Sequence, residues 1–184
     1  FHSATKFLSG HGVVIGGILV DGGTFRWDEG PARGKFPTLT EPYHGFHDMV
    51  FSEESTTHAF LLRARREGIR DFGACMAPFT AFQILQGVET LPLRMAKHVD
   101  NARRVAAFLA THPMVESVGY PDLPSHPDHE LAARLMPRGC GAVFSFAIRG
   151  TRAQGRRLIE SLNLFSHLAN VGDAKSLVIH PAST

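Results

Sequence analysis

A lysine placed between hydroxyl residues and glycines is the first feature of this chain that could do chemistry. Lys6 follows Ser3 and Thr5 and precedes Gly10 and Gly12. Hydroxyl groups three residues and one residue before the lysine can donate hydrogen bonds to a phosphate, and a neutral lysine amine can form an imine with an aldehyde. The same residue types are common in surface loops, so by themselves they indicate a site for a phosphorylated aldehyde only weakly.

Histidines and cysteines offer weaker alternatives. Two histidine pairs, His44 with His47 and His126 with His129, share a spacing of three residues. A metal ion needs three or four converging ligands, and both pairs lie in or beside proline-containing loops, so solvated histidines are favoured and no metal site is predicted. Cys75 has apolar neighbours and no nucleophile motif around it, which favours a buried structural cysteine.

The composition is that of an ordinary globular chain. Of the 184 residues, 43% are hydrophobic and 20% are charged, which allows a sizeable core. The net charge of +2 is too small to indicate nucleic-acid or anionic-membrane binding. The two cysteines form no disulfide framework, and neither a signal peptide nor an apolar run of membrane-spanning length is recognisable. We therefore expect no membrane or nucleic-acid partner and a cytoplasmic location.

Hydrophobic periodicity predicts alternating helices and strands. The lysine motif leads into a β-branched run over residues 13–20 that is typical of a buried strand. Prolines predict a loop over residues 31–43, and Pro92 is expected to kink or divide a helical stretch that begins near Pro78. The other predicted elements are helices over residues 56–71, 93–111, 129–136 and 152–162 and strands over residues 115–120, 140–148 and 176–180.

The order of the residues around Lys6 is more specific than their types. The run from Ser3 to Gly12, Ser-Ala-Thr-Lys-Phe-Leu-Ser-Gly-His-Gly, resembles the cofactor-lysine signature of the pyridoxal-phosphate (PLP) enzymes of cysteine and methionine metabolism. Residues 16–23, 85–95 and 166–184 resemble the O-acetylhomoserine sulfhydrylase branch of that family, in which asparagine is usual at the position of Asn170.

This resemblance implies an α/β fold, the aspartate aminotransferase-like fold type I of PLP-dependent transferases. Residues 1–111 would form the C-terminal part of the large PLP-binding domain, and residues 112–184 an incomplete small C-terminal domain. Because the lysine motif begins almost at Phe1 and the chain stops after a strand pattern, we expect a fragment of a larger protein. The resemblance also implies that the intact enzyme is a homotetramer.

The same resemblance implies the chemistry of the site. PLP would be the cofactor, and Lys6 would be the catalytic residue that binds it as a Schiff base and moves protons. Ser3 and Thr5 would donate to the cofactor phosphate, and Asn170 and Val171 would contact the substrate. The implied reaction is a γ-replacement that converts O-acetyl-L-homoserine and sulfide to L-homocysteine and acetate.

Other functions stay open at this point. Sulfhydrylases acting on O-acetylserine or O-succinylhomoserine, and methionine or cystathionine γ-lyases, belong to the same family. A non-catalytic fragment that serves assembly is an alternative of a different class. Other family residues that hold the cofactor would lie outside this chain, so we expect the isolated chain to bind PLP weakly and to turn over no substrate.

Overall fold

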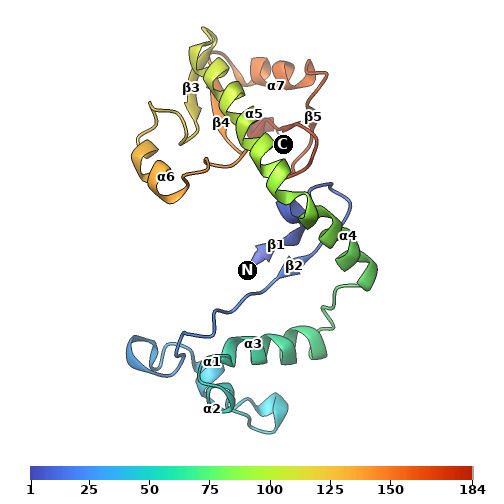
Figure 1. Cartoon of the computed structure of the whole chain (residues 1–184), viewed down its shortest axis with the longest axis vertical. Coiled ribbons are helices and arrows are strands. Elements are labelled where there is room, and N and C mark those ends of the chain that lie inside the picture. Colours follow the sequence, from blue (N-terminus) through green and yellow to red (C-terminus); the bar gives the residue numbers. More distant parts are fainter. Residues whose placement is uncertain (184) are drawn as a thin grey trace. The chain divides into compact units, whose positions relative to one another are not determined.

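The computed structural model describes residues 1–183 and shows two compact units (Figure 1). One unit contains residues 1–2 and 16–78, and the other contains residues 3–15 and the described chain from residue 79 onward. The helices are α1 (Pro37–Thr40), α2 (Phe51–Glu54), α3 (Ala59–Arg63), α4 (Pro78–Glu89), α5 (Leu91–Thr111), α6 (His129–Leu135) and α7 (Arg152–Glu160). The strands are β1 (His2–Ser3), β2 (Gly17–Ile18), β3 (Val115–Gly119), β4 (Ser145–Ile148), β5 (Ser166–His167) and β6 (Leu177–Val178). Short helical turns cover Ala4–Leu8, Gly30–Ala32, His44–Phe46, Ala64–Asp71 and Pro181–Ser183.

The first unit has a small aromatic core. Leu39, Phe51 and Ala59, one from each of α1, α2 and α3, are buried together. Trp27 packs against them, and its indole N–H donates to the carbonyl of Thr57 at 3.2 Å. Each short helix contributes one hydrophobic side chain to this core, and the aromatic rings of Phe36 and Tyr43 also pack against it.

Two predictions for this unit meet different outcomes. The helix predicted over residues 56–71 is confirmed from Ala59 onward, since α3 continues into π-helical turns that reach Asp71, and Gly73 follows with a φ of +73°. The loop predicted over residues 31–43 is wrong in part, because Pro37 begins the short helix α1. Proline suits a first helical turn, where its missing N–H has no intrahelical partner.

The prediction of a buried strand over residues 13–20 is wrong for most of its length. Only β2 is a strand there, paired with β1, and Val13, Ile15 and Val20 are 62%, 88% and 71% exposed. A strand is buried only where neighbouring strands and a covering layer flank it, and the described residues place only the two-residue β1 beside this run. The apolar composition of residues 13–20 favours a buried strand, but no covering layer buries them among the residues that the structure describes.

The second unit is built along α4 and α5, which meet at Thr90. Pro78 begins α4 and Pro92 lies in the first turn of α5. The predicted helices and their division near Pro92 are therefore confirmed. At the other end, α5 stops because His112, which precedes Pro113, adopts an extended ψ of 128°.

A two-stranded antiparallel sheet packs against the C-terminal half of α5. β3 pairs with β4, with Gly119 opposite Ser145. Ala102 and Ala106 of α5 are buried against Tyr120, which directly follows β3. The strand predicted over residues 115–120 is confirmed, whereas the one predicted over residues 140–148 begins only at Ser145.

The last elements are short. α6 and α7 confirm the two predicted helices, and α7 starts with a capping box in which Thr151 and Gln154 exchange hydrogen bonds. The strand predicted over residues 176–180 shrinks to β6, which pairs in parallel with β5. The domain boundary predicted near residue 112 stays a prediction.

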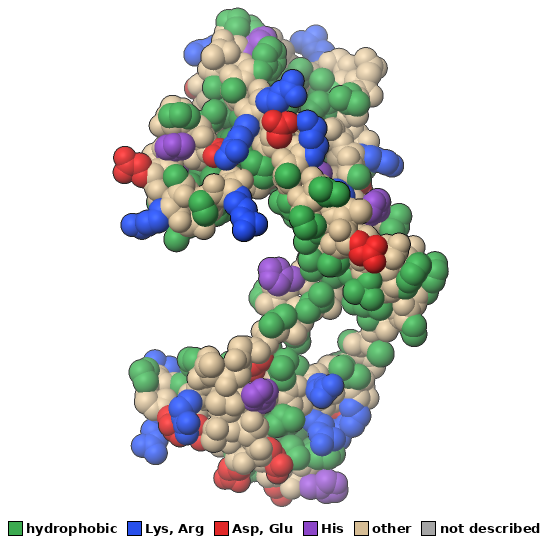
Figure 2. Space-filling model, in the orientation of Figure 1, with side chains coloured by type: hydrophobic (Ala, Val, Ile, Leu, Met, Phe, Trp, Pro, Cys, Tyr) green, Lys and Arg blue, Asp and Glu red, His purple; other side chains and the backbone are tan. Residues whose placement is uncertain are grey.

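Large hydrophobic side chains remain on the surface. Phe79, Phe82 and Leu85 of α4 and Leu93 of α5 are 56–75% exposed, and Figure 2 shows hydrophobic side chains gathered over the region of α4. Among residues 1–183, none of the helices combines the length and the apolar character needed to cross a membrane.

Candidate functional site

The backbone around Lys6 leaves the regular helical path. Residues Ala4–Leu8 form a π-helical turn, but Lys6 itself has a φ of −91° and a ψ of −125°, outside the helical region. The turn is closed by the amide of Ser9, which donates to the carbonyl of Ala4 at 3.1 Å, and by the amide of Gly10, which donates to the carbonyl of Lys6 at 2.8 Å. The lysine therefore lies at a break inside a closed turn.

The Lys6 side chain meets a residue from the far end of the chain. Its ammonium Nζ donates to the amide oxygen Oδ1 of Asn170 at 2.7 Å, and both residues are half-buried. Two of the residues predicted for the site are thus brought together across 164 positions of sequence. Val171, the next residue, is 37% exposed.

Two glycines let the neighbouring segments approach the lysine turn closely. Gly87 of α4 is buried, and a Cβ atom there would overlap the carbonyl oxygens of Leu8 and Ser9. Gly172, with a φ of +75°, is also buried, and a Cβ there would overlap the backbone amide of Phe7. The lysine turn is therefore enclosed between α4 and the loop that carries Asn170, at distances that only glycine permits.

Arg94 of α5 fastens the same turn through its backbone. Its Nη1 donates to the carbonyl of Phe7 at 2.9 Å, and its Nη2 donates to the carbonyls of Leu8 at 3.3 Å and Gly87 at 2.5 Å. Its Nε donates to the hydroxyl of Thr90 at 3.0 Å. Sequence reasoning assigned no role to Arg94, because a lone arginine on an amphipathic helix is usually a solvated charge.

The segment after Asn170 and helix α5 make further contacts with Phe7 and Gly10. The amide of Ala174 donates to the carbonyl of Gly10 at 2.8 Å, and the ring of Phe7 meets the ring of His98 edge to face at 5.8 Å. Burial, followed by the nearby positive charge of Arg94, holds the pKa of His98 below its usual range, although Asp173 acts in the opposite direction. The lowered pKa favours the neutral form of His98, whose ring packs against the residue that follows Lys6.

The two predicted phosphate ligands differ in position. Ser3 is exposed, whereas Thr5 is half-buried and its carbonyl accepts a hydrogen bond from the hydroxyl of Ser9 at 3.0 Å. Their contacts with a phosphate stay predictions. The Nδ1 of His11 lies 2.6 Å from the carbonyl oxygen of Ser9, and this contact stabilises the loop after the lysine.

The donor groups of this site suit PLP. An amine for the aldehyde is half-buried at Lys6, and hydroxyl donors for a phosphate stand one and three residues before it. The closed turn and its glycine contacts limit the movement of the amine. A primary amine held in a fixed place beside hydroxyl donors is the donor set that a phosphorylated aldehyde requires.

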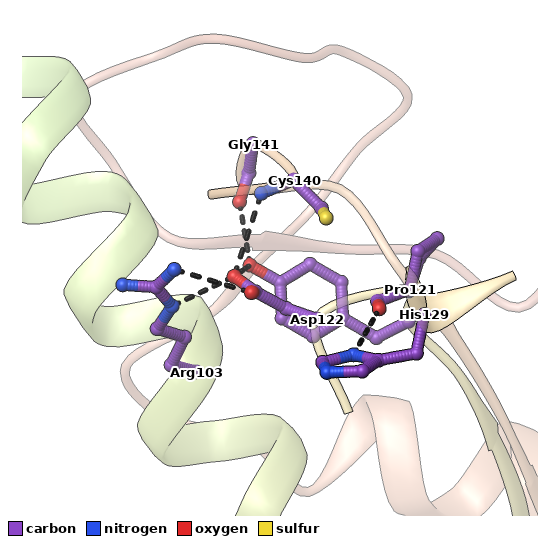
Figure 3. Close-up of polar contacts among 7 residues, drawn as sticks. Arg103, Pro121, Asp122, His129, Cys140 and Gly141 are labelled. Atoms are coloured by element: carbon purple, nitrogen blue, oxygen red, sulfur yellow. Dashed lines mark hydrogen bonds and ion pairs between the residues drawn. The ribbon is translucent and has the colours of Figure 1, made fainter. Parts of the chain in front are cut away.

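A second polar cluster lies at the other end of α5 (Figure 3). Asp122 accepts two hydrogen bonds from the guanidinium of Arg103, at 2.7 and 3.1 Å, and the Tyr120 hydroxyl donates to the carbonyl of Gly141 at 2.8 Å. Burial, with Asp122 nearby, raises the pKa of Tyr120 to about 12, and the bond from Arg103 lowers the pKa of Asp122. With Tyr120 fully buried, this cluster connects α5, the residues after β3 and the loop before β4.

The remaining candidates contribute no further site. Among residues 1–183, no three histidine, cysteine or carboxylate side chains converge as a metal ion would need. His44 pairs with Asp48 at 2.5 Å on the surface, and His129 contacts the carbonyl of Pro121 at 3.0 Å. The prediction of a buried Cys75 is wrong, since this residue is exposed. Residues 73–77 belong to no helix or strand, and neither hydrophobic core cluster contains Cys75, although its neighbours are apolar.

Known proteins match this chain along its full length. The family model described as Cys/Met metabolism PLP-dependent enzyme covers residues 1–184. The chain is 49% identical to an O-acetyl-L-homoserine sulfhydrylase of Leptospira meyeri and 48% identical to a homocysteine synthase of Schizosaccharomyces pombe, in each case over 100% of this chain and 42% of the relative. It thus spans less than half the length of these curated relatives.

A solved structure matches as well. A crystal structure assigned as an O-acetylhomoserine (thiol)-lyase of Campylobacter jejuni, which contains N'-pyridoxyl-lysine-5'-monophosphate, superposes with a TM-score of 0.85 at 33% identity. The match covers 100% of this chain and 43% of that one. The α/β, fold type I assignment is thereby confirmed, and the chain belongs to the PLP-dependent enzymes of cysteine and methionine metabolism.

Proposed function

We propose that this chain is the lysine-bearing part of an O-acetylhomoserine sulfhydrylase, which converts O-acetyl-L-homoserine and sulfide to L-homocysteine and acetate. The observation that carries the proposal is the 2.7 Å contact between the amine of Lys6 and Asn170, inside a turn enclosed by α4 and α5. The similarity of the whole chain to part of a sulfhydrylase and part of a homocysteine synthase supports this reaction over others of the family.

In this proposal, Lys6 holds PLP through its amine, and the hydroxyls of Ser3 and Thr5 donate to the phosphate. When bound, the cofactor withdraws electrons from the α-carbon of the substrate. This chain supplies the amine, its fixed position and the proton transfers. Lysine suits the task because its ammonium can lose a proton, which arginine cannot do.

Lys6 then acts as the base and acid of the reaction. Its neutral amine takes the proton from the α-carbon of O-acetylhomoserine and holds it at Nζ, from where the proton is returned to carbon. Acetate leaves from the γ-carbon with the electrons of the broken C–O bond. The sulfur of sulfide forms the new bond to that carbon, so the products are homocysteine and acetate.

Asn170 has two tasks in the proposal. Without the cofactor its amide oxygen accepts a hydrogen bond from Lys6, which orients the amine. Once the Lys6 amine holds the cofactor, the Asn170 amide and the neighbouring Val171 backbone are available for the substrate carboxylate.

Chemical trapping of the cofactor tests the proposal. A full-length polypeptide that contains residues 1–184 is reduced with borohydride, digested and analysed by mass spectrometry. We expect the phosphopyridoxyl group on the peptide that contains Lys6 and on no other lysine peptide. A group found on Lys97 or Lys175, or on none, would falsify the assignment of Lys6.

Substrate preference needs a separate assay. The same polypeptide is incubated with sulfide and with O-acetylhomoserine, O-acetylserine or O-succinylhomoserine in turn, and without sulfide to detect γ-elimination. We expect the fastest sulfide-dependent turnover with O-acetylhomoserine. Faster reaction with another ester, or release of an oxoacid without sulfide, would replace the proposed reaction by that alternative.

The assembly and the location are also proposals. We propose a homotetramer in the cytoplasm for the full-length enzyme, and size-exclusion chromatography with light scattering measures the assembly. The two free thiols, Cys75 and Cys140, suit a reducing compartment. The isolated 184-residue chain is expected to bind PLP weakly, because it spans 42% of the sulfhydrylase it resembles.

A further inference from the structure

Arg94 is bonded to the lysine turn in a way that a surface charge is not. Three of its four acceptors are backbone carbonyls, two of them in the residues that directly follow Lys6. The fourth acceptor, the Thr90 hydroxyl, orients the guanidinium from its own helix. Hydrogen bonds from a charged donor are stronger than neutral ones, and the rigid fork of arginine can reach several carbonyls at once.

A second observation points the same way. Gly10 has a φ of +72°, and a Cβ atom there would overlap three atoms of the Arg94 guanidinium. The guanidinium thus occupies the space that the missing side chain of Gly10 leaves open. Contacts at both Phe7–Leu8 and Gly10 hold the C-terminal half of the lysine turn on α5.

We propose that Arg94 is a positioning residue for Lys6, which fixes the backbone after the lysine so that its amine stands at one place relative to the cofactor. This inference rests on the proposed function. Lys6 departs from helical geometry, and Arg94 bonds the two residues on its C-terminal side to α5. Displacement of a catalytic group by about 1 Å can reduce a rate about a hundredfold.

The test uses four variants of the full-length, PLP-loaded polypeptide. Arg94→Lys keeps the charge but loses the fork, and Arg94→Met loses both. Thr90→Val removes only the hydroxyl that orients the guanidinium. The matched control is Arg104→Met, because Arg104 is an exposed arginine on the same helix.

Three measurements separate positioning from general folding. Steady-state kinetics should show kcat reduced about ten- to a hundredfold in Arg94→Lys, with KM within about threefold of the unchanged protein. In a pH titration, the absorbance of the lysine-bound cofactor should change with a midpoint pH that differs between Arg94→Lys and the unchanged protein. Hydrogen exchange in the cofactor-free protein should be at least about tenfold faster at the amides of Ser9 and Gly10 but unchanged in β3 and β4.

The outcomes are distinct. If Arg94→Lys matches Arg104→Met in kcat, in pH midpoint and in exchange, the inference is overturned. If Arg94→Met does not fold, Arg94→Lys and Thr90→Val test the inference instead. The changes in kcat, pH midpoint and exchange should be smaller in Thr90→Val than in Arg94→Lys and in the same direction. If the unchanged protein carries no cofactor on Lys6, the proposed function itself fails, which borohydride trapping detects before any variant is made.

Discussion

The two ends of α5 use arginine in opposite ways. Near its N-terminus, Arg94 donates mainly to backbone carbonyls of other segments, and glycines surround the contact. In the C-terminal half of α5, the half-exposed Arg103 donates to the carboxylate of Asp122, so this contact joins two side chains (Figure 3). A bond to backbone fixes the path of a chain, whereas a bond between side chains fastens elements whose paths are already set.

This difference assigns different tasks to the two ends. The N-terminal end contacts the turn of Lys6, whose amine we propose to be the reactive group, and the C-terminal end fastens the β3–β4 sheet around the buried Tyr120. Substitution of Lys6 or Arg94 at the first end should therefore change chemistry more than stability. Substitutions at the second end should change stability alone.

Replacement of the lysine should have the largest effect. Lys6→Arg keeps a positive charge but removes the ability to lose a proton, so turnover of O-acetylhomoserine by the full-length enzyme should fall about 10³-fold. Steady-state kinetics measure the loss. Lys97→Arg is the control, because Lys97 is exposed on α5 and paired with Asp100. Equal activity of the two variants would remove Lys6 from the mechanism.

Closing the space at Gly87 should have the next largest effect. The Cβ of Gly87→Ala meets the backbone of Leu8 and Ser9, which cannot move aside as a flexible side chain could, so the free energy of unfolding should fall by about 2 kcal/mol. The control is Gly68→Ala, where the new methyl group meets nothing within 4 Å. Urea unfolding measures both, and a loss of equal size in the control would contradict the close-approach argument.

The C-terminal cluster should respond in stability only. Tyr120→Phe leaves the carbonyl of Gly141 without the hydroxyl donor, which should reduce the free energy of unfolding by about 1–2 kcal/mol. The pH midpoint of the lysine-bound cofactor should not change. A shifted midpoint would mean that the two ends of α5 are coupled, and the division of tasks drawn above would have to be abandoned.

A pH dependence gives the smallest and most specific test. Arg103 lowers the pKa of Asp122, so the ionised carboxylate stabilises the fold above the pKa of an unfolded aspartate, and this contribution is lost as pH falls through the lower folded pKa. At pH 7 the unchanged protein should be about 1 kcal/mol more stable than Asp122→Asn. Urea unfolding should show this difference shrinking below about pH 4. A difference that grows toward acid pH would reverse the assigned sign.

Local signals in the sequence predicted the helices well. Pro78 and Pro92 place the starts of α4 and α5, and His112 before Pro113 places the end of α5. These signals act within a few residues, so no knowledge of neighbours is needed. The lysine motif predicted the family equally well, since the family signature is the order of ten consecutive residues.

Strand burial and the exposure of Cys75 could not be predicted in this way. The run over residues 13–20 has a strand composition but is exposed, and the apolar neighbours of Cys75 do not cover it. Burial depends on which segments lie alongside, and composition does not contain that information.

What the sequence by itself determined is the family and the helices that flank the lysine motif, and it singled out Lys6 as the proposed reactive amine. Only the tertiary structure decided that Asn170 meets this amine across 164 positions and that Arg94 bonds to the carbonyls after it. The physical reason is that a motif records side-chain types in order along the chain. Contacts between distant segments depend on backbone carbonyls and on the space that Gly10, Gly87 and Gly172 leave open, which appear only once the chain is folded.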